Sequence, residues 1–420
     1  MKKAIASLLL VSTLSFCNFK YIFAAPSAPD PSAAGMVVID ATTGEVLFEK
    51  NKDVKYPPAS PTKLMTALLT LENCNLDEKV TVGATPPTIE GSRIYIDQGE
   101  VLTVRQLLYA LIMVSANDCA EALAEHIGGS QENFAKMMNE RAKKLGCKNT
   151  NFTNPHGLYE PDHRTTAYDL ALVEKELLKN PEYIKISRTK TLFLEPTNKY
   201  KEKRPLWNDN RLLHDYEDYY YEPCIAAKTG YTDESLHSFV ASAEKGNEKY
   251  IVSLLYDPYK TYFKDSKSIF EWAFNNFDTV KLYSKNDLIT NYEAEDGTII
   301  PLLASSDEFY TKDLSLKEEP QISFNTNSLD KKSFLKGQSI ATAIMKYNNS
   351  TREIKLISGT DYTPKKFPVV AKIIKDNERT IKIALIIGFI LLLLLIVLII
   401  RRINLRKKRR RRLNRLTRKH

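Results

Sequence analysis

The sequence has few of the residues that metal sites and disulfide frameworks need. Its six histidines form no His-Glu-x-x-His motif or comparable cluster, so a zinc carboxypeptidase is disfavoured. Its five cysteines contain no Cys-x-x-Cys pair and no spacing typical of a disulfide framework. The sequence also contains no internal repeat. We therefore expect a folded protein that uses neither a metal nor another cofactor.

Acidic residues are absent from the last twenty positions, which hold twelve Lys or Arg. These positions account for the formal net charge of +9, because the rest of the chain has 48 basic and 51 acidic residues. A mildly acidic body disfavours a nucleic-acid-binding surface on the folded part of the chain. We expect no nucleic-acid partner.

The N-terminus, residues 1–25, is typical of a secretory signal peptide. Two lysines form a charged start, Ala4–Phe16 is an apolar run, and the small residues Ala24 and Ala25 follow. We expect cleavage near Ala25 and export of the chain that follows.

A second apolar run, Ile383–Ile400, contains no charged residue. At ~1.5 Å per helical residue it is about 27 Å long, close to the ~30 Å hydrocarbon core of a bilayer. The basic residues 401–420 follow at once, and positive charge favours the cytoplasmic side. The sequence predicts a single-pass protein of the cell membrane, with residues 383–400 in the lipid bilayer, a cytoplasmic tail and an extracytoplasmic body.

The pattern of the body predicts two domains after a short linker at 26–34. Residues 35–280 begin with a hairpin pattern at 35–51, followed by helical patterns and a second hairpin pattern at 236–256. A helical pattern at 266–276 closes this domain. This order predicts an α/β (α+β) domain: one antiparallel sheet with its first and last strands adjacent, and helices packed on it. Residues 281–378 alternate short strand patterns with polar turns and predict a small all-β domain.

A serine and a lysine open the helical pattern PPASPTKLMTALLTLE. Pro61 favours a helix start, which places Ser60 in the first turn and Lys63 within reach on the same face. A serine hydroxyl becomes a good nucleophile only when a base takes its proton, and a lysine serves as that base only when its pKa is lowered. The plain alternative is a capping serine, and Ser-x-x-Lys occurs five times in the chain.

Two further short motifs add weight to the first. Ser115 and Asn117 form Ser-x-Asn between two helical patterns, where a helix cap is the plain alternative. Lys228, Thr229 and Gly230 form the sequence's one Lys-Thr-Gly, just before the second hairpin. Lysine and threonine offer a cation and a hydroxyl to a carboxylate, and glycine allows close approach of a substrate backbone.

The order Ser-x-x-Lys, Ser-x-Asn, Lys-Thr-Gly is the signature of the penicillin-interacting serine acyltransferases. The chain resembles the low-molecular-weight penicillin-binding proteins, specifically the serine-type D-alanyl-D-alanine carboxypeptidases. The likeness covers about 35–280, and 284–378 resembles the family's C-terminal domain. It extends to the residues around the motifs, at 57–68, 154–158, 166–171 and 228–232.

The resemblance implies an enzyme that removes the terminal D-Ala from peptidoglycan stem pentapeptides and is inhibited by β-lactam antibiotics. It makes Ser60 the nucleophile, Lys63 the general base and Ser115 a proton relay. It implies that Asn117 holds the substrate amide and Lys63. The terminal carboxylate would be held by Lys228 and Thr229, beside Gly230, and the oxyanion by the backbone N–H groups of Ser60 and Tyr231.

Other functions remain open at this stage. A D,D-endopeptidase would use the same residues. A class A β-lactamase shares the motifs and needs a glutamate to activate water, for which Glu160 is a weak candidate. A non-catalytic cell-wall-binding module is disfavoured, because it would not need Ser60, Lys63 and Lys228.

Overall fold

The structure is a computed structural model that describes residues 28–325, 329–348, 350–364 and 377–416. The signal peptide expected at 1–25 lies outside the described residues. The chain divides into two compact units. The first contains the residues up to Val280 together with Phe309–Lys317, and the second contains Lys281–Glu308 and the chain from Glu318 onward.

The first unit is built on a five-stranded antiparallel sheet with the strand order β2-β1-β9-β8-β7. Strand β1 pairs with β9, so the first strand lies beside the last, as the sequence predicted. Strand β7 is at one edge of the sheet. The strand bounds are β1 Gly35–Asp40, β2 Val46–Lys50, β7 Cys224–Thr232, β8 Leu236–Lys245 and β9 Glu248–Asp257.

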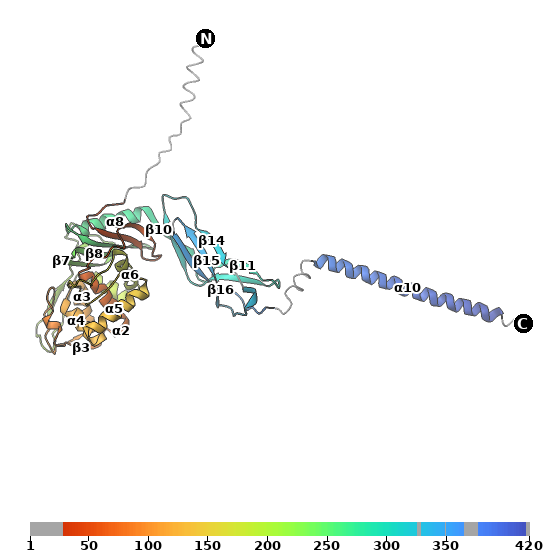
Figure 1. Cartoon of the computed structure of the whole chain (residues 1–420), viewed down its shortest axis with the longest axis horizontal. Helices are drawn as coiled ribbons and strands as arrows, with labels where there is room; N and C mark the ends of the chain where they lie inside the picture. Colours follow the sequence, from red (N-terminus) through yellow and green to blue (C-terminus); the bar gives the residue numbers. More distant parts are fainter. Residues whose placement is uncertain (1–27, 326–328, 349, 365–376, 417–420) are drawn as a thin grey trace, which may run out of the picture. The chain divides into compact units, whose positions relative to one another are not determined.

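The sheet has a packed layer on each face, which explains why all six residues of β1 are buried. Val37 and Ile39 point into the larger core, among the helices, while Met36 and Val38 point into a second core under helix α8 (Tyr262–Asn276). This alternation follows from the two-residue period of a strand. Figure 1 shows α8 on one side of β8 and the helices of the larger core on the opposite side.

Six helices form the larger layer, and α3 is deeply buried in it, with eight of its ten residues buried. Thr103 caps α3 in a reciprocal capping box with Gln106. The helices are α2 (Lys63–Asn73), α3 (Val104–Met113), α4 (Asn117–Gly128), α5 (Gln131–Leu145), α6 (Ala167–Leu177) and α7 (Pro181–Arg188), with short 3-10 turns η1 (Ser60–Thr62), η2 (Pro86–Thr88) and η3 (Arg211–Leu213).

Three short two-stranded ribbons lie wholly or partly in the first unit. Asp40, at the end of β1, accepts hydrogen bonds from Thr279 Oγ1 at 2.7 Å and Thr311 Oγ1 at 2.8 Å, and so attaches the sheet to one of them. The ribbons are β3 (Lys79–Thr81) with β4 (Val101–Thr103), β5 (Thr191–Leu194) with β6 (Arg204–Trp207), and β10 (Phe277–Tyr283) with β13 (Glu308–Asp313).

The second unit contains a five-stranded sheet with the order β11-β12-β16-β15-β14, and its pairings are antiparallel. A 3-10 turn, η4 (Leu329–Lys331), follows its edge strand β14. The strand bounds are β11 Leu288–Glu293, β12 Ile299–Ala304, β14 Gln321–Asn325, β15 Ser339–Tyr347 and β16 Ser350–Ser358.

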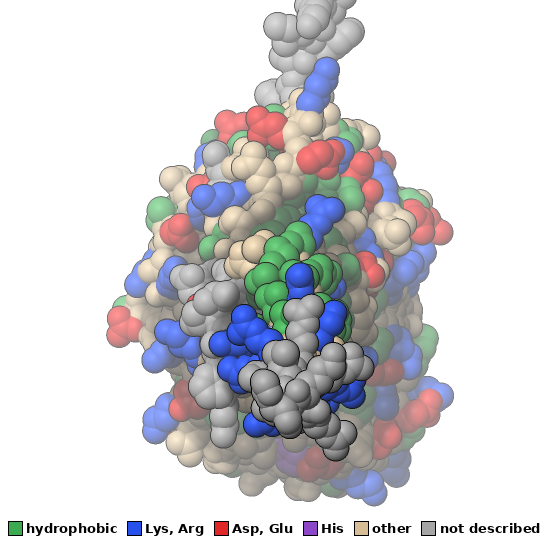
Figure 2. Space-filling model, turned by 90° about the vertical axis from the view of Figure 1, so that its right-hand side faces the viewer, with side chains coloured by type: hydrophobic (Ala, Val, Ile, Leu, Met, Phe, Trp, Pro, Cys, Tyr) green, Lys and Arg blue, Asp and Glu red, His purple; other side chains and the backbone are tan. Residues whose placement is uncertain are grey.

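Helix α10, Glu378–Leu416, is long and apolar enough to cross a membrane. Its apolar part has a mean hydropathy of 3.7 and is exposed throughout, which is unusual for a helix surrounded by water. Figure 2 shows apolar and basic side chains gathered on this helix. The described part of the chain has one helix of this kind.

A buried carboxyl joins the helical layer to the sheet. Glu174 on α6 is completely buried and accepts hydrogen bonds from Ser242 Oγ on β8 and from the Tyr183 hydroxyl on α7, each at 2.7 Å. Burial raises the pKa of Glu174 to about 7, because the charged form loses its hydration.

The pKa of Glu174 makes stability depend on pH. A carboxyl that titrates higher in the folded state than in the unfolded state weakens the fold as pH rises from about 4.5 to about 7. The isosteric variant Glu174→Gln should therefore be more stable than wild type at pH 8, with a free energy of unfolding higher by roughly 1–3 kcal/mol. This difference in stability should vanish near pH 4.5. Denaturant unfolding at both pH values measures this, and equal stabilities at pH 8 would contradict it.

Candidate active site

Ser60 and Lys63 meet where η1 runs into α2. Nζ of Lys63 lies 3.0 Å from Oγ of Ser60. Ser60 caps no helix: the residue before η1 is Ala59, whose φ of 53° is rare for a residue with a Cβ. The Ala59 carbonyl is held by the Thr62 backbone N–H and hydroxyl, at 3.1 and 2.8 Å. The capping interpretation of this serine is therefore not supported.

Lys63 is completely buried, although it carries an amine. Its Nζ donates to the backbone carbonyl of His156 at 2.6 Å. Burial, and then the nearby charge of Lys228, hold the pKa of Lys63 well below its usual value. A neutral amine next to a serine hydroxyl is the arrangement that a general base requires.

The Lys-Thr-Gly segment lies on the edge strand β7, directly against Ser60. A Cβ on Gly230 would be 2.4 Å from Cδ of Pro61 and 2.8 Å from the backbone nitrogen of Ser60. The glycine is therefore needed for β7 to approach the serine. Lys228 is buried in the same strand, and burial lowers its pKa to about 8.

The Ser-x-Asn segment links α3 to α4. Ser115 has a φ of 61°, and its Oγ is buried without a hydrogen-bond partner among the described residues. Asn117 begins α4, and its side-chain amide donates to the carbonyl of Glu90 at 2.6 Å. Asn117 thus fastens the loop around residue 90 to the start of α4.

A cavity of about 490 Å³ lies between these segments. Ser60, Ser115, Thr229, Gly230 and Tyr231 line it, whereas Lys63, Asn117 and Lys228 are not among its lining residues. Five further residues on its wall were not predicted from the sequence, which are Ser92, Asp209, His237, Lys260 and Tyr262.

One of the missed residues had a signal in the sequence. His237 lies opposite Tyr231 across the β7–β8 pair, and their rings are 4.7 Å apart. The register of the β7–β8 hairpin places this histidine beside Tyr231, whose backbone N–H is expected to bind the oxyanion. The other four come from loops or separate elements that only the tertiary fold brings together.

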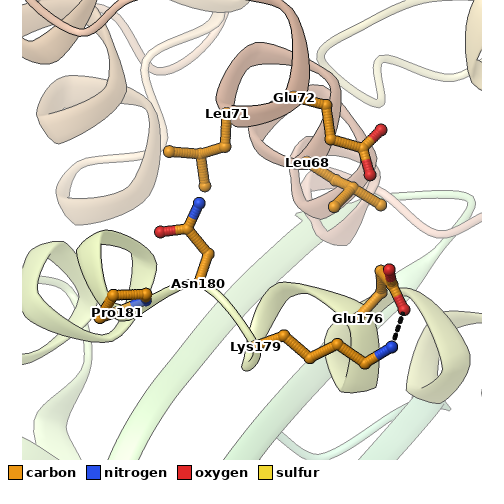
Figure 3. A pocket seen from close by; sticks show the side chains of 7 residues that line it. All are labelled: Leu68, Leu71, Glu72, Glu176, Lys179, Asn180 and Pro181. Carbon is orange, nitrogen blue, oxygen red and sulfur yellow. Dashed lines mark hydrogen bonds and ion pairs between the residues drawn. The ribbon is translucent and has the colours of Figure 1, made fainter.

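A second hollow, of about 300 Å³, lies between α2 and the turn from α6 to α7 (Figure 3). Its polar residues include Glu72, Asn180 and the Glu176–Lys179 pair, whose charged atoms are 2.7 Å apart. It contains neither a serine nor a cysteine on its wall. It offers no nucleophile to compare with Ser60.

One group of side chains in the described part of the chain has possible metal-ligand atoms close together. The donor atoms of Cys74, Glu78 and His126 lie within 4.8 Å of one another. Glu78 and His126 already pair at 3.0 Å, and none of the three residues lines the Ser60 cavity. The group therefore has no part in the chemistry of that cavity.

Comparison with known proteins identifies the family. The family model for D-alanyl-D-alanine carboxypeptidase matches residues 23–258. The chain belongs to this family. The D-alanyl-D-alanine carboxypeptidase DacF of Bacillus subtilis is 37% identical over 273 residues, which cover 63% of this chain and 68% of that protein. The D-alanyl-D-alanine carboxypeptidase DacB2 of Mycobacterium tuberculosis is 31% identical over 252 residues, which cover 59% of this chain and 84% of that protein.

Solved structures agree with this assignment. Penicillin binding protein 5 from Haemophilus influenzae matches with a TM-score of 0.69 and 29% identity, over 80% of this chain and 98% of that one. The resemblance read from the three motifs is thereby confirmed, as are the fold class and the type of enzyme: a serine D-Ala-D-Ala carboxypeptidase.

The two buried lysines predict a bell-shaped pH dependence of kcat/KM. Activity should rise as Lys63 loses its proton and becomes a base, and fall above pH 8 as Lys228, with a pKa of about 8, loses the charge that a substrate carboxylate needs. In Lys228→Arg the arginine keeps its charge above pH 8. The falling limb of the kcat/KM profile of this variant should therefore lie at higher pH than in wild type.

The matched control for this experiment is Lys260→Arg, because Lys260 lines the same cavity. The falling limb of the kcat/KM profile of Lys260→Arg should lie at the same pH as in wild type. A falling limb that moves to higher pH in Lys260→Arg and not in Lys228→Arg would contradict the role proposed for Lys228.

Proposed function

We propose that this carboxypeptidase works through an acyl-enzyme on Ser60. The observation that carries the proposal is the 3.0 Å approach of Lys63 Nζ to Ser60 Oγ, with Ser60 on the cavity wall. Ser60 attacks the carbonyl carbon of the penultimate D-Ala while its proton passes to Lys63. The backbone N–H groups of Ser60 and Tyr231 hold the oxyanion that forms.

Collapse of the tetrahedral intermediate breaks the peptide bond and needs a proton for the departing D-Ala. Ser115 suits this step, because its buried Oγ lines the cavity and has no hydrogen-bond partner among the described residues. It would pass the proton from Lys63 to the leaving amine. Water then attacks the ester on Ser60, and Lys63 accepts a proton again.

Lys228 and Thr229 would bind the terminal carboxylate of the substrate. Lys228 is a buried cation in the strand that lies against Ser60, and Thr229 lines the cavity. Charge-assisted hydrogen bonds of this kind are about twice as strong as neutral ones. Asn117 would turn its amide from the Glu90 carbonyl to the substrate.

The proposed substrate is the stem pentapeptide of peptidoglycan, and β-lactams would acylate the same serine. A D,D-endopeptidase remains the nearest alternative. A class A β-lactamase is less well supported, because Glu160 accepts a hydrogen bond from Asn154 at 2.9 Å and does not line the cavity. A non-catalytic module would not need the buried Lys63.

We also propose that residues 383–400 span the cell membrane, with the catalytic unit outside and residues 401–420 inside. The length and hydropathy of α10 support a span, and the basic residues after Ile400 support this orientation. Residues 26–34 would serve as the linker, and 35–280 and 281–378 as the catalytic and C-terminal β-rich domains.

Acylation by benzylpenicillin tests the nucleophile. Detergent-solubilised full-length protein should gain the mass of one penicilloyl group, while Ser60→Ala should gain none and should lose D-Ala release from a pentapeptide by a factor of about a thousand or more. Intact-mass spectrometry and a D-Ala assay measure the two effects. Rapid hydrolysis of penicillin without an adduct would instead support the alternative that the protein is a β-lactamase.

Removal of α10 tests the anchor. A chain that ends at residue 377 should appear in the soluble extracytoplasmic fraction, whereas the full chain should resist extraction from membranes by alkaline carbonate. Protease added outside the cell should remove the catalytic unit and spare the tail. A full chain that alkaline carbonate releases would rule out the span.

A further inference from the structure

The chain has two tryptophans, and they lie in opposite surroundings. Trp272 on α8 packs edge-on against Phe48 and Phe277, with ring centroids 6.0 and 5.3 Å apart. Trp207, at the end of β6, is 63% exposed. A large aromatic side chain left open to solvent calls for an explanation when it belongs to a larger apolar surface.

Trp207 shares one face of the β5–β6 ribbon with other exposed side chains. The register pairs Thr191 with Trp207 and Phe193 with Pro205, and all four side chains are exposed. The intervening pair, Leu192 and Leu206, faces the core, with Leu206 buried and Leu192 partly buried, as the two-residue period of a strand requires. We call Thr191, Phe193, Pro205 and Trp207 the ribbon face.

The ribbon face is held firmly and leads straight to the active-site cavity. Asn208, next to Trp207, is buried and donates to the carbonyls of Ser187 and Thr189, each at 3.0 Å. The next residue, Asp209, donates its backbone N–H to the carbonyl of Met113 at 2.9 Å and lines the cavity. Only Asn208 lies between Trp207 and Asp209 on the cavity wall, so the chain separates the two residues by at most about 7 Å.

We propose that the ribbon face binds the sugar of the glycan strand that carries the stem peptide, an inference that rests on the proposed function. With the terminal D-Ala-D-Ala in the cavity, three residues of a pentapeptide remain, and they reach about 10 Å when extended. That reach is longer than the stretch of at most about 7 Å between Asp209 on the cavity wall and Trp207.

The chemistry of the ribbon face suits a sugar ring. The C–H groups on one side of a pyranose carry slight positive charge and stack on the electron-rich face of an aromatic ring. The Thr191 hydroxyl adds a hydrogen-bonding group, and none of the four side chains is charged. A neutral sugar can therefore leave water here without leaving a buried charge unpaired.

The small size of the ribbon face argues against a protein as its occupant. A stable protein interface buries about 800 Å² on each partner, whereas an entire aromatic side chain contributes about 150–250 Å². The two aromatic residues here are only 54% and 63% exposed. The face has the dimensions of one or two sugar rings.

Kinetics on two substrates tests the proposal in the full-length enzyme. The first substrate is a disaccharide pentapeptide, and the second is an acylated peptide with the same D-Ala-D-Ala end and no sugar. Trp207→Ala should lower kcat/KM for the first by about fivefold to tenfold and leave the second within about twofold. Trp207→Phe should restore most of the loss, because it retains a ring. Tyr216→Ala, at an aromatic residue that is 78% exposed and outside the ribbon, is the matched control.

A binding experiment separates the proposal from the proposed function. Tryptophan fluorescence of Ser60→Ala should change on titration with a peptide-free glycan oligosaccharide, and the change should disappear when Trp207→Phe is added. An equal loss on both substrates, no loss on either, or no fluorescence change would overturn the sugar site. Self-association in sedimentation that Trp207→Ala abolishes would assign the face to a second copy and also overturn it. Lack of D-Ala release from both substrates by wild type would instead overturn the proposed function, while the fluorescence titration would still decide the sugar site.

Discussion

The burial of the Lys63 amine beside Ser60 is the constraint on which the rest of the active site depends. An ammonium group in a dry interior is costly, and the group responds by losing its proton. Lys228, buried in the neighbouring strand, pushes the pKa of Lys63 in the same direction. The fold thus favours the neutral amine of Lys63, and the proposal that Lys63 acts as the base follows from this.

Close backbone contacts fix this arrangement. Gly230 allows β7 to touch Ser60 and Pro61, and Gly157, at a φ of 88°, lies so near Ala59 that a Cβ would be 1.9 Å from its carbonyl oxygen. Ala59 and Ser115 occupy positive φ values that cost free energy. Strain of this kind persists only where the surrounding structure enforces it, and here it occurs on both sides of the cavity.

The sequence predicted the parts of this account that depend on local pattern. The hairpins at 35–51 and 236–256 and the adjacency of the first and last strands came from periodicity and order, and the structure confirms them. Ser-x-x-Lys was ambiguous by itself, because four other copies occur in the chain. Its specificity came from the order of three motifs, which the family match supports.

The parts that the sequence could not predict depend on tertiary structure. Ser92, Asp209, Lys260 and Tyr262 come to the cavity from loops and a helix end with no spacing signal. Residues 309–317 return to the first unit from within the second, and no local pattern marks that return. Exposure of Trp207 likewise becomes visible only once the register of β5 and β6 is known.

The most direct test of the central claim is an NMR titration of Lys63 in enzyme with isotope-labelled lysine, assigned by comparison with Lys63→Arg. The Lys63 signal should titrate well below the ordinary value of 10.5, so that the amine is largely neutral where the enzyme is active. A Lys63 that keeps its proton up to about 10.5 would be no base for Ser60, and the proposed mechanism would be wrong.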